Sequence, residues 1–263
     1  MKSILLLGLG AFALQAFATC PPLDPQGPKI VSPSNAFNAF YTKTIDKPGL
    51  QIVASSSTCD RTLQVAYEIA HEMLSKRPDI ESRLIAQKAF IAIFSVTEKL
   101  TDLPEDHDLA GKPTGGDPSL TFDDLCGGGG VPGRPTAICE KNLIGVNDPY
   151  YGRMSVLVHE FGHAMQNLGI DAATAAKVQV AYQNATAANL FPATRGSGVS
   201  WMMSNQNEFF AEGTGTWFNA ADPKNPANSP EETGRANLKT YDPELYQILA
   251  NIYPDDNWVY PRK

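Results

Sequence analysis

The segment His159-Glu160-Phe161-Gly162-His163 constrains the fold of this chain more than any other stretch of its sequence. Because an α-helix has 3.6 residues per turn, His159 and His163 lie on one helical face, one turn apart. Two imidazoles at this spacing can bind one zinc ion at about 2.0 to 2.1 Å. Glu160 then lies beside the metal, where it can take a proton from zinc-bound water and pass it to a leaving amine. The segment therefore predicts a zinc-binding helix with Glu160 as general base.

The residues around this motif indicate that its helix is buried. We expect a helix over residues 151–168 with one apolar stripe, formed by Met154, Leu157, Val158, Phe161 and Met165. Two imidazoles and a carboxylate beside such a stripe are costly to bury without a partner, and a metal ion is the obvious one. The other two histidines lack this setting. His71 has no histidine four residues later and His107 lies in a polar loop, so we interpret both as ordinary histidines.

A catalytic zinc ion needs a third protein ligand, and the segment 207–212, NEFFAE, offers one. Glu208 and Glu212 are four residues apart and share a helical face, so Glu208 can reach the metal while Glu212 accepts a hydrogen bond from a ligand or steadies the helix. The alternative is an ordinary amphipathic helix whose carboxylates face solvent. Phe209 and Phe210 make much of this helix apolar and favour the metal site.

The two motifs together resemble the anthrax lethal factor-like branch of the gluzincin metallopeptidases, which also pairs HEFGH with a later EFFAE. The likeness is close over residues 159–164 and 207–212 and looser over residues 89–95 and 100–104. It implies an α+β fold: a single zincin-like metallopeptidase domain with an active-site helix, a small mixed sheet and an edge strand above the cleft that binds extended peptide.

The same resemblance implies roles for individual residues. One zinc ion per chain would be held by His159, His163 and Glu208, with Glu160 as the general base and Glu212 supporting a ligand. Members of this family commonly place a tyrosine shortly before the third ligand, where it stabilises the oxyanion.

This chain has Trp201 near that position. An indole N–H can donate a hydrogen bond but cannot act as an acid. Three alternatives remain open: Trp201 substitutes, a distant tyrosine takes over, or activity is low. The candidate tyrosines are Tyr182, Tyr241 and Tyr253.

The first 18 residues have the layout of a secretory signal peptide. Lys2 supplies the positive end, residues 4–14 form an apolar run too short to span a bilayer, and Ala16-Phe17-Ala18 matches the pattern that a signal peptidase cleaves. We expect the mature chain to begin at Thr19 and to be secreted to the extracellular medium. An uncleaved N-terminal anchor is the alternative, because no later stretch is long and apolar enough to span a membrane.

Four cysteines in a secreted chain predict two disulfides. None belongs to a CxxC pair, and three pairings are possible. We favour Cys20 with Cys59 and Cys126 with Cys139, because the second bond would fasten the glycine run 127–130. Secretion would also make Asn184-Ala185-Thr186 a usable glycosylation site, at Asn184.

The charge of the chain argues against one class of partner. Its net charge is −7, and no basic cluster could follow a phosphate backbone. We therefore expect no nucleic acid and no membrane as partners, but a peptide or protein substrate for a monomeric protein.

The remaining sequence predicts a single domain over residues 58–263. Residues 19–57 suggest an irregular N-terminal arm, a few short strands or a short pro-segment. Helices are expected over 60–76, with Asp60 as N-cap, over 171–189, from 204 onward and over 243–251. A buried strand is expected over 89–95, a short edge strand over 135–143, and a long loop over 106–130.

Three functions fit this pattern. The first is a secreted zinc-dependent metalloendopeptidase. The second is a non-catalytic secreted zinc-binding effector or adhesin that keeps the zincin fold. The third is a zinc ion that serves only the structure. Structural zinc sites normally have four protein ligands, and only three are found here. Glu160 favours the first function, because zinc binding alone does not need it.

Overall fold

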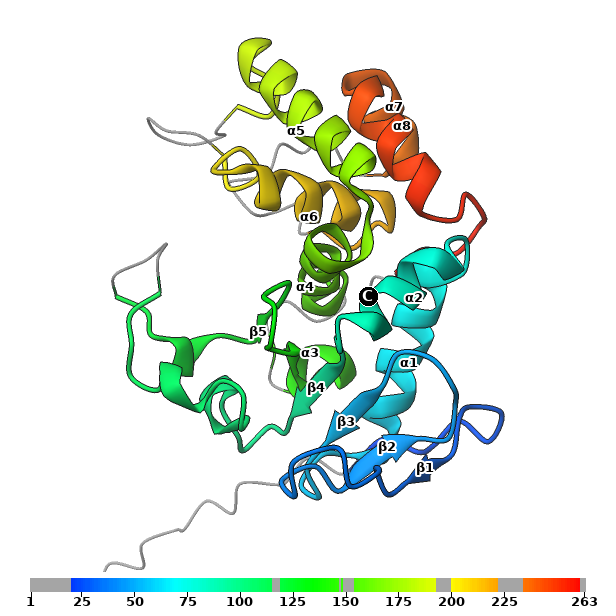
Figure 1. The fold of residues 1–263 in the computed structure, drawn as a ribbon, viewed down its shortest axis with the longest axis vertical. Coiled ribbons are helices and arrows are strands. Elements are labelled where there is room, and N and C mark those ends of the chain that lie inside the picture. The colour runs from blue at the N-terminus through cyan, green and yellow to red at the C-terminus, as the bar shows by residue number, and fades with distance from the viewer. Residues whose placement is uncertain are drawn as a thin grey trace, which may run out of the picture.

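The fold is that of a computed structural model, which describes residues 20–114, 119–146, 148, 154–192, 200–221 and 234–260. The expected signal peptide, residues 1–18, and the expected mature start at Thr19 lie outside the described residues. A mixed sheet lies at one end of the molecule and a group of helices at the other, with helix α4 between them (Figure 1). The α+β single-domain fold expected from the sequence is confirmed.

The sheet has six short strands in the order β1-β2-β3-β4-β6-β5. Strands β3, β4 and β6 are parallel, and β1, β2 and β5 run antiparallel to their neighbours. The strands are β1 (Ile30–Val31), β2 (Lys43–Ile45), β3 (Ile52–Ala54), β4 (Ile91–Phe94), β5 (Gly127–Gly128) and β6 (Thr136–Cys139).

The N-terminal segment supplies three of the six strands, β1 to β3, so a few short strands, one of the alternatives left open for it, is what the structure contains. One expectation about this sheet was wrong. The strand expected at an edge over 135–143 is β6, which lies inside the sheet between β4 and β5. It is buried at all four positions, as a parallel strand covered on both faces should be.

Both faces of the sheet are covered because successive side chains of a strand point to opposite sides. Ile91 and Ile93 of β4 pack into the larger core, which includes α1, α4 and the helical end of the molecule. Ala92 and Phe94 pack on the other face into a smaller cluster that includes Tyr41. The continuous apolar run of β4 therefore serves two cores.

The helices are α1 (Asp60–Leu74), α2 (Pro78–Ala86), α3 (Glu140–Ile144), α4 (Val156–Ala164), α5 (Ala172–Ala187), α6 (Gln206–Trp217), α7 (Arg235–Tyr241) and α8 (Pro243–Ile252). A π-helical turn, η4 (Met165–Gly169), follows α4 directly. Short 3-10 helices are η1 (Leu100–Asp102), η2 (His107–Leu109) and η3 (Phe122–Asp124).

Helix α1 begins at the residue that was expected to be its cap. Cys59 is the N-cap residue and makes no side-chain cap hydrogen bond, whereas Asp60 is the first helical residue. The expectation that Asp60 caps the helix was therefore wrong. Asp60 instead forms an ion pair of 2.7 Å with Lys43, which ties the helix to strand β2.

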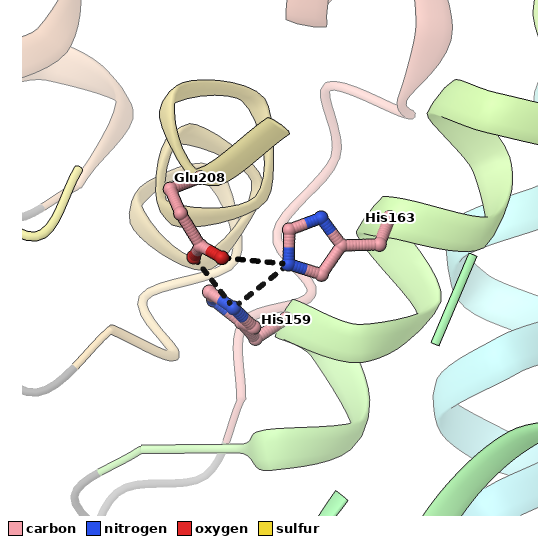
Figure 2. Close-up of side chains that lie close together, drawn as sticks. All are labelled: His159, His163 and Glu208. Atoms are coloured by element: carbon pink, nitrogen blue, oxygen red, sulfur yellow. Dashed lines mark hydrogen bonds and ion pairs between the residues drawn. The ribbon is translucent and has the colours of Figure 1, made fainter. Parts of the chain in front are cut away.

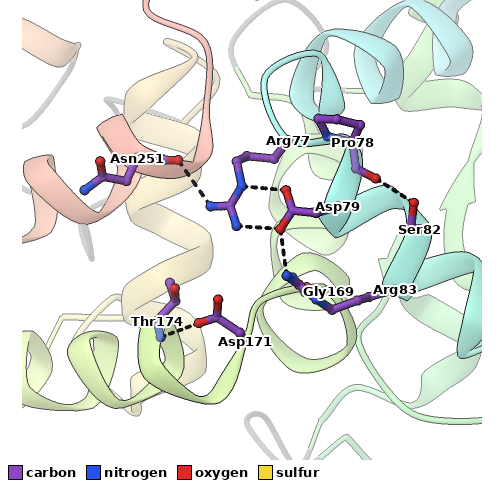
Figure 3. Close-up of polar contacts among 9 residues, drawn as sticks. All are labelled: Arg77, Pro78, Asp79, Ser82, Arg83, Gly169, Asp171, Thr174 and Asn251. Atoms are coloured by element: carbon purple, nitrogen blue, oxygen red, sulfur yellow. Dashed lines mark hydrogen bonds and ion pairs between the residues drawn. The ribbon is translucent and has the colours of Figure 1, made fainter.

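A polar network connects the sheet-bearing part of the molecule to its helical end (Figure 3). Asp79 of α2 accepts hydrogen bonds of 2.7 Å from both Arg77 and Arg83. Arg77 also donates to the carbonyl of Asn251 in α8 at 3.3 Å. Arg83 donates to the carbonyl of Gly169 at the end of η4 at 2.6 Å. One carboxylate thus orients two arginines that hold α8 and the end of η4.

Disulfides join Cys20 to Cys59 and Cys126 to Cys139, which confirms the favoured pairing. The second bond joins the residue before β5 to the last residue of β6, and the Cys139 amide also donates to the Cys126 carbonyl at 2.7 Å. Within the described ranges, we find no helix with the length and apolar character needed to cross a bilayer.

Candidate metal centre

Local sequence fixes where helix α4 begins and how close it lies to α6. The Ser155 hydroxyl accepts a hydrogen bond from the Val158 amide at 3.3 Å, and the Val156 amide donates to the Asn142 side chain at 2.9 Å. These bonds satisfy two of the amides that a helix start leaves unpaired. Further along, a Cβ on Gly162 would lie 3.3 Å from Thr214 of α6. Glycine therefore allows the two helices to pack closely.

Helix α6 is positioned by its own cap. The Asn205 side chain accepts hydrogen bonds from the amides of Asn207 and Glu208, at 2.9 and 3.0 Å. Glu208 consequently lies in the first turn of α6, where the helix dipole favours a carboxylate. Phe209 and Phe210 are fully buried, so the helix cannot turn its carboxylates freely toward solvent.

These two helices bring His159, His163 and Glu208 together (Figure 2). The Nε2 atoms of the two histidines are 3.1 Å apart. Glu208 places Oε2 at 3.2 Å from Nε2 of His159 and Oε1 at 3.6 Å from Nε2 of His163. No other cluster of three such groups occurs among the residues that the structure describes.

The donor set fits a zinc ion. Four ligands in a tetrahedron with bonds of about 2.0 to 2.1 Å lie about 3.3 Å from one another. The three separations of 3.1, 3.2 and 3.6 Å are close to that value. Oε2 of Glu208 is buried, and the polar atom that faces it is Nε2 of His159 at 3.2 Å. A buried carboxylate that faces two imidazole nitrogens is the arrangement that a cation would complete.

Glu212 supports the site from one turn further along α6. Its Oε1 lies 3.3 Å from Nδ1 of His159, on the opposite side of the ring from Nε2, and the residue is 5% exposed. A carboxylate at this nitrogen fixes the tautomer of a metal-binding histidine and leaves Nε2 free to bind. Because Glu208 and Glu212 are one helical turn apart, helix α6 contacts both ring nitrogens of His159.

The electrostatics of the two histidines differ. Burial opposes a charge on His159, but hydrogen bonds with Glu208 and Glu212 outweigh it and raise the pKa of His159 well above its ordinary value. Burial next to His159 lowers the pKa of His163 to about 4. Burial likewise opposes the charge of Glu208, yet hydrogen bonds with His159 and Trp201 lower the pKa of Glu208. The centre therefore attracts positive charge.

Glu160 lies beside the three clustered groups and has a raised pKa. It lines the cleft beside the donors but is not one of the three clustered groups. Burial, opposed by His159, raises the pKa of Glu160 to about 7. A carboxylate with a pKa near the working pH both accepts and returns a proton efficiently.

The three donors line a cleft of about 780 Å³. Described residues between Leu120 and Val131 form one wall, where Gly127, Gly128 and Gly129 line the cleft without side chains. A Cβ on Gly129 would lie 2.4 Å from the Glu160 carbonyl, and one on Gly130 would lie 2.7 Å from the His163 backbone. The glycine run thus allows strand β5 and the residues after it to lie directly against helix α4.

The expected tyrosines all lie elsewhere. The hydroxyl of Tyr182 donates to the Met203 carbonyl, that of Tyr241 accepts from the Phe191 amide, and that of Tyr253 bonds to Thr214. None of the three lines the cleft, and neither does any other tyrosine of the described ranges. Trp201 does line it, with 43% of the residue exposed.

The comparisons with known proteins agree with this centre. A family model described as "Anthrax toxin lethal factor, N- and C-terminal domain" matches residues 62–252, which include both motifs and most of the chain. The chain belongs to the anthrax toxin lethal factor family. Membership confirms the resemblance inferred from the two motifs and the class of enzyme, a zinc metallopeptidase.

A solved structure gives the same fold. This lethal factor family member is similar to the Pro-Pro endopeptidase PPEP-2 from Paenibacillus alvei. The TM-score is 0.51 and the sequence identity is 18%. The match covers 77% of this chain and 97% of PPEP-2, so most of the fold is shared. A search of curated protein sequences found no match.

The other residues considered in the sequence analysis lie outside the cleft. Asn184 lies on the exposed face of α5, and its side chain donates to Glu244 at 2.9 Å. His71 stacks on Tyr67, and His107 bonds to the Thr101 carbonyl.

Asn167 was not singled out from the sequence. Its side chain donates to the Gly130 carbonyl at 3.1 Å and lines the cleft, and only its closeness to the motif could have drawn attention to it.

Proposed function

We propose that the chain is a secreted zinc-dependent endopeptidase in which His159, His163 and Glu208 bind one zinc ion and Glu160 is the general base. The observation that carries this proposal is the cluster of three donors at separations suited to zinc, with the Glu160 carboxylate beside it in an open cleft. Family membership and the likeness to a protein named as an endopeptidase support it.

A zinc ion held by His159, His163 and Glu208 would supply Lewis acidity toward a water molecule and the carbonyl of the bond to be cut. Glu160 would accept a proton from the attacking water and return it to the leaving amine. Glu212 keeps the ring of His159 oriented. The exposed edge of β5, whose glycines line the cleft, offers backbone groups to an extended peptide.

The roles of the two glutamates can be separated by substitution. Glu208→Gln should weaken zinc binding, because it replaces an anionic ligand with a neutral amide. Glu160→Gln should keep the zinc but lower peptide hydrolysis by about 100- to 10,000-fold, because the proton acceptor is lost. Metal content and hydrolysis are measured on both variants and the parent. If Glu160→Gln cuts the best peptide at the parent's rate, the mechanism is wrong.

Composition offers an independent check on the same proposal. The secreted protein should contain one zinc ion per chain and no free thiol, since all four cysteines are paired. Metal analysis and thiol titration under denaturing conditions measure both quantities. A chain that is free of metal and cannot be reloaded would rule out the zinc site.

One observation favours a second candidate function, a non-catalytic secreted effector or adhesin that binds zinc. No tyrosine of the described ranges lines the cleft, so none of the described residues there is the tyrosine that members of this family commonly use for the oxyanion. A peptide library incubated with the zinc-loaded protein, with and without a chelator, separates the two functions. Cleavage that the chelator abolishes supports the endopeptidase.

We further infer that residues 1–18 are removed on secretion, that the protein is monomeric and that Asn184 carries a glycan when the host cell can attach one. The proposal keeps peptides or proteins as partners and excludes nucleic acid and membranes. N-terminal sequencing and the mass of the secreted protein in solution test these points.

A further inference from the structure

A second pocket is formed by the segment 32–42, which connects strands β1 and β2. Its volume is about 420 Å³, and we call it the β1–β2 pocket. Strands β1 and β2 lie at the opposite edge of the sheet from β5 (Figure 1). The pocket shares no lining residue with the cleft that holds the zinc donors, so a ligand bound in it would occupy a separate site.

The side chains around this pocket are polar but uncharged. Ser32, Ser34, Asn35 and Thr42 offer three hydroxyls and one amide. All four residues are exposed, and none of their side chains makes a hydrogen bond with the described part of the chain. None of the described residues that line the pocket is charged, although 19% of the chain is charged. The pocket therefore presents neutral groups that both donate and accept hydrogen bonds.

An aromatic ring adds an apolar surface to the same pocket. Phe37 lines the pocket and is half-buried. Its ring packs edge-on against Tyr41 and Phe90, with 6.2 and 5.3 Å between ring centroids, beside the smaller core cluster. Two neighbouring rings thus hold Phe37 in place, and a ligand that covers its remaining exposed surface gains hydrophobic free energy.

Hydrogen bonds within the segment fix the shape of the pocket. The Phe37 amide donates to the Ser34 carbonyl at 3.2 Å, and the Tyr41 amide donates to the Asn38 carbonyl at 3.0 Å. The Asn38 side chain also accepts from the Phe40 amide at 2.9 Å, as asparagine often does in turns. Tyr41 itself is 3% exposed and anchors the segment to the core. A pocket that is already formed loses little conformational entropy when a ligand binds.

We propose that the β1–β2 pocket binds a neutral oligosaccharide. Each hydroxyl of a sugar donates and accepts hydrogen bonds, and so do the hydroxyl and amide side chains of the pocket. The C–H groups of a sugar ring form an apolar face that the ring of Phe37 can cover. A charged ligand would find no side chain of opposite charge here, and a lipid chain would leave the polar groups unpaired. The inference does not depend on the zinc site, because the two sites share no residue.

Binding of soluble oligosaccharides to the zinc-loaded protein tests this inference. The neutral probes are maltohexaose, cellohexaose, mannohexaose and chitohexaose, and hexagalacturonic acid is the charged comparison. NMR titration should show saturable binding of at least one neutral probe, with shifted amide signals in the segment 32–42 and unshifted signals in β5. The inference is overturned if no neutral probe binds, or if hexagalacturonic acid binds as tightly as the best neutral probe.

Substitutions in the segment show whether the saccharide lies in this pocket. Asn35→Ala should weaken binding about 3- to 10-fold, the usual effect of one lost hydrogen bond, and its side chain has no partner in the fold to lose. Phe37→Ala should weaken binding at least about 10-fold, because the apolar face of the sugar loses its contact. Phe40→Ala is the control, because Phe40 packs against Tyr41 but does not line the pocket.

The affinities of the four proteins decide the outcome. Weaker binding by Asn35→Ala and Phe37→Ala, with parental binding by Phe40→Ala, supports the inference. If Phe37→Ala does not fold, the comparison of Asn35→Ala with the parent still tests it. Equal affinities of Asn35→Ala and the parent would place the saccharide elsewhere and overturn the inference.

Discussion

Trp201 lies near the position where members of this family commonly have a tyrosine. Its indole hydrogen bond is one of the contacts that lower the pKa of Glu208, against the opposing effect of burial. Its exposed ring lines the cleft at the same time. One side chain thus contacts both a zinc donor and the space that a substrate would occupy.

Trp201→Phe should weaken zinc binding while keeping an aromatic ring at the rim. The phenyl ring has no N–H, so Glu208 loses a hydrogen bond that orients it, and contacts of this kind are worth about 10- to 100-fold in metal affinity. The zinc dissociation constant is measured by competition with a chelator. Trp258→Phe is the control, because Trp258 packs against Phe218 and does not line the cleft. Equal affinities for both variants would contradict the role of the N–H.

At the scale of residues, the sequence predicted what helical spacing determines. The turn of an α-helix brings His159 and His163 together, and the same spacing on a second helix relates Glu208 to Glu212. No spacing rule relates Trp201 or Asn167 to the centre. Their positions depend on how the loop before α6, which contains Trp201, and the turn η4, which contains Asn167, pack in the folded protein. Sequence spacing does not determine this packing.

Strand β5 is the element that forms the cleft edge, and one side chain fastens its downstream end. Asn167, in the π-helical turn η4, donates to the Gly130 carbonyl at 3.1 Å. Gly130 has a φ of +74°, and a Cβ there would collide with the backbone of His163. The contact therefore needs a glycine on one side and the asparagine on the other.

Asn167→Leu should raise the KM for peptides several-fold and change kcat and zinc content much less. Leucine fills a similar volume but cannot donate to Gly130, so β5 is held less firmly against α4 while the zinc donors stay in place. Steady-state kinetics and metal analysis measure the three quantities. Asn251→Leu is the control, because Asn251 makes a similar side-chain bond to the Gln247 carbonyl on α8. A KM equal to that of the parent would show that the bond does not position the edge.

At the scale of elements, long periodic segments were predictable and short ones were not. The helices expected over 171–189 and 243–251 appear as α5 and α8 within about two residues at each end, a normal uncertainty for helix ends. Helices α2, α3 and α7 have at most nine residues each, too few to show a clear period. Strand β5 consists of glycine, which disfavours strands, so only pairing with β6 defines it.

The arginine network around Asp79 predicts how the whole molecule responds to acid. Hydrogen bonds from Arg77 and then Arg83 lower the pKa of Asp79. A carboxyl group whose pKa is lowered by folding stabilises the protein above its ordinary pKa, and this contribution is lost as the pH falls below it. Because the Asp79 side chain is 43% exposed, solvent screening limits the contribution to about 1 kcal/mol or less.

Asp79→Asn should therefore lower the free energy of unfolding at pH 7 by up to about 1 kcal/mol. The difference from the parent should shrink progressively as the pH falls below about 4, where the carboxylate of the parent begins to be protonated. Urea denaturation of both proteins between pH 7 and pH 3 measures it. A difference that stays constant over this range would show that the charge of Asp79 does not hold the network together.

The two disulfides differ in how much they contribute to the stability of the whole molecule and in how close they lie to the cleft. Cys20–Cys59 spans 39 residues and Cys126–Cys139 spans 13, so loop-closure entropy assigns them about 4 and about 3 kcal/mol of stability respectively. The first bond ties the N-terminal segment to the start of α1, and neither of its cysteines lines the cleft. The second lies directly before β5, which lines the cleft.

Replacing each pair by alanine should separate stability from substrate binding. Cys20→Ala with Cys59→Ala should cost more unfolding free energy, yet leave the KM for peptides unchanged while the protein stays folded. Cys126→Ala with Cys139→Ala should cost less, yet raise the KM, because β5 is then held at its upstream end only by backbone bonds to β6. Urea denaturation and peptide kinetics at a temperature where both variants are folded measure the two effects. If KM follows stability in both variants, the second disulfide is only a stabilising bond, and the cleft edge does not depend on it.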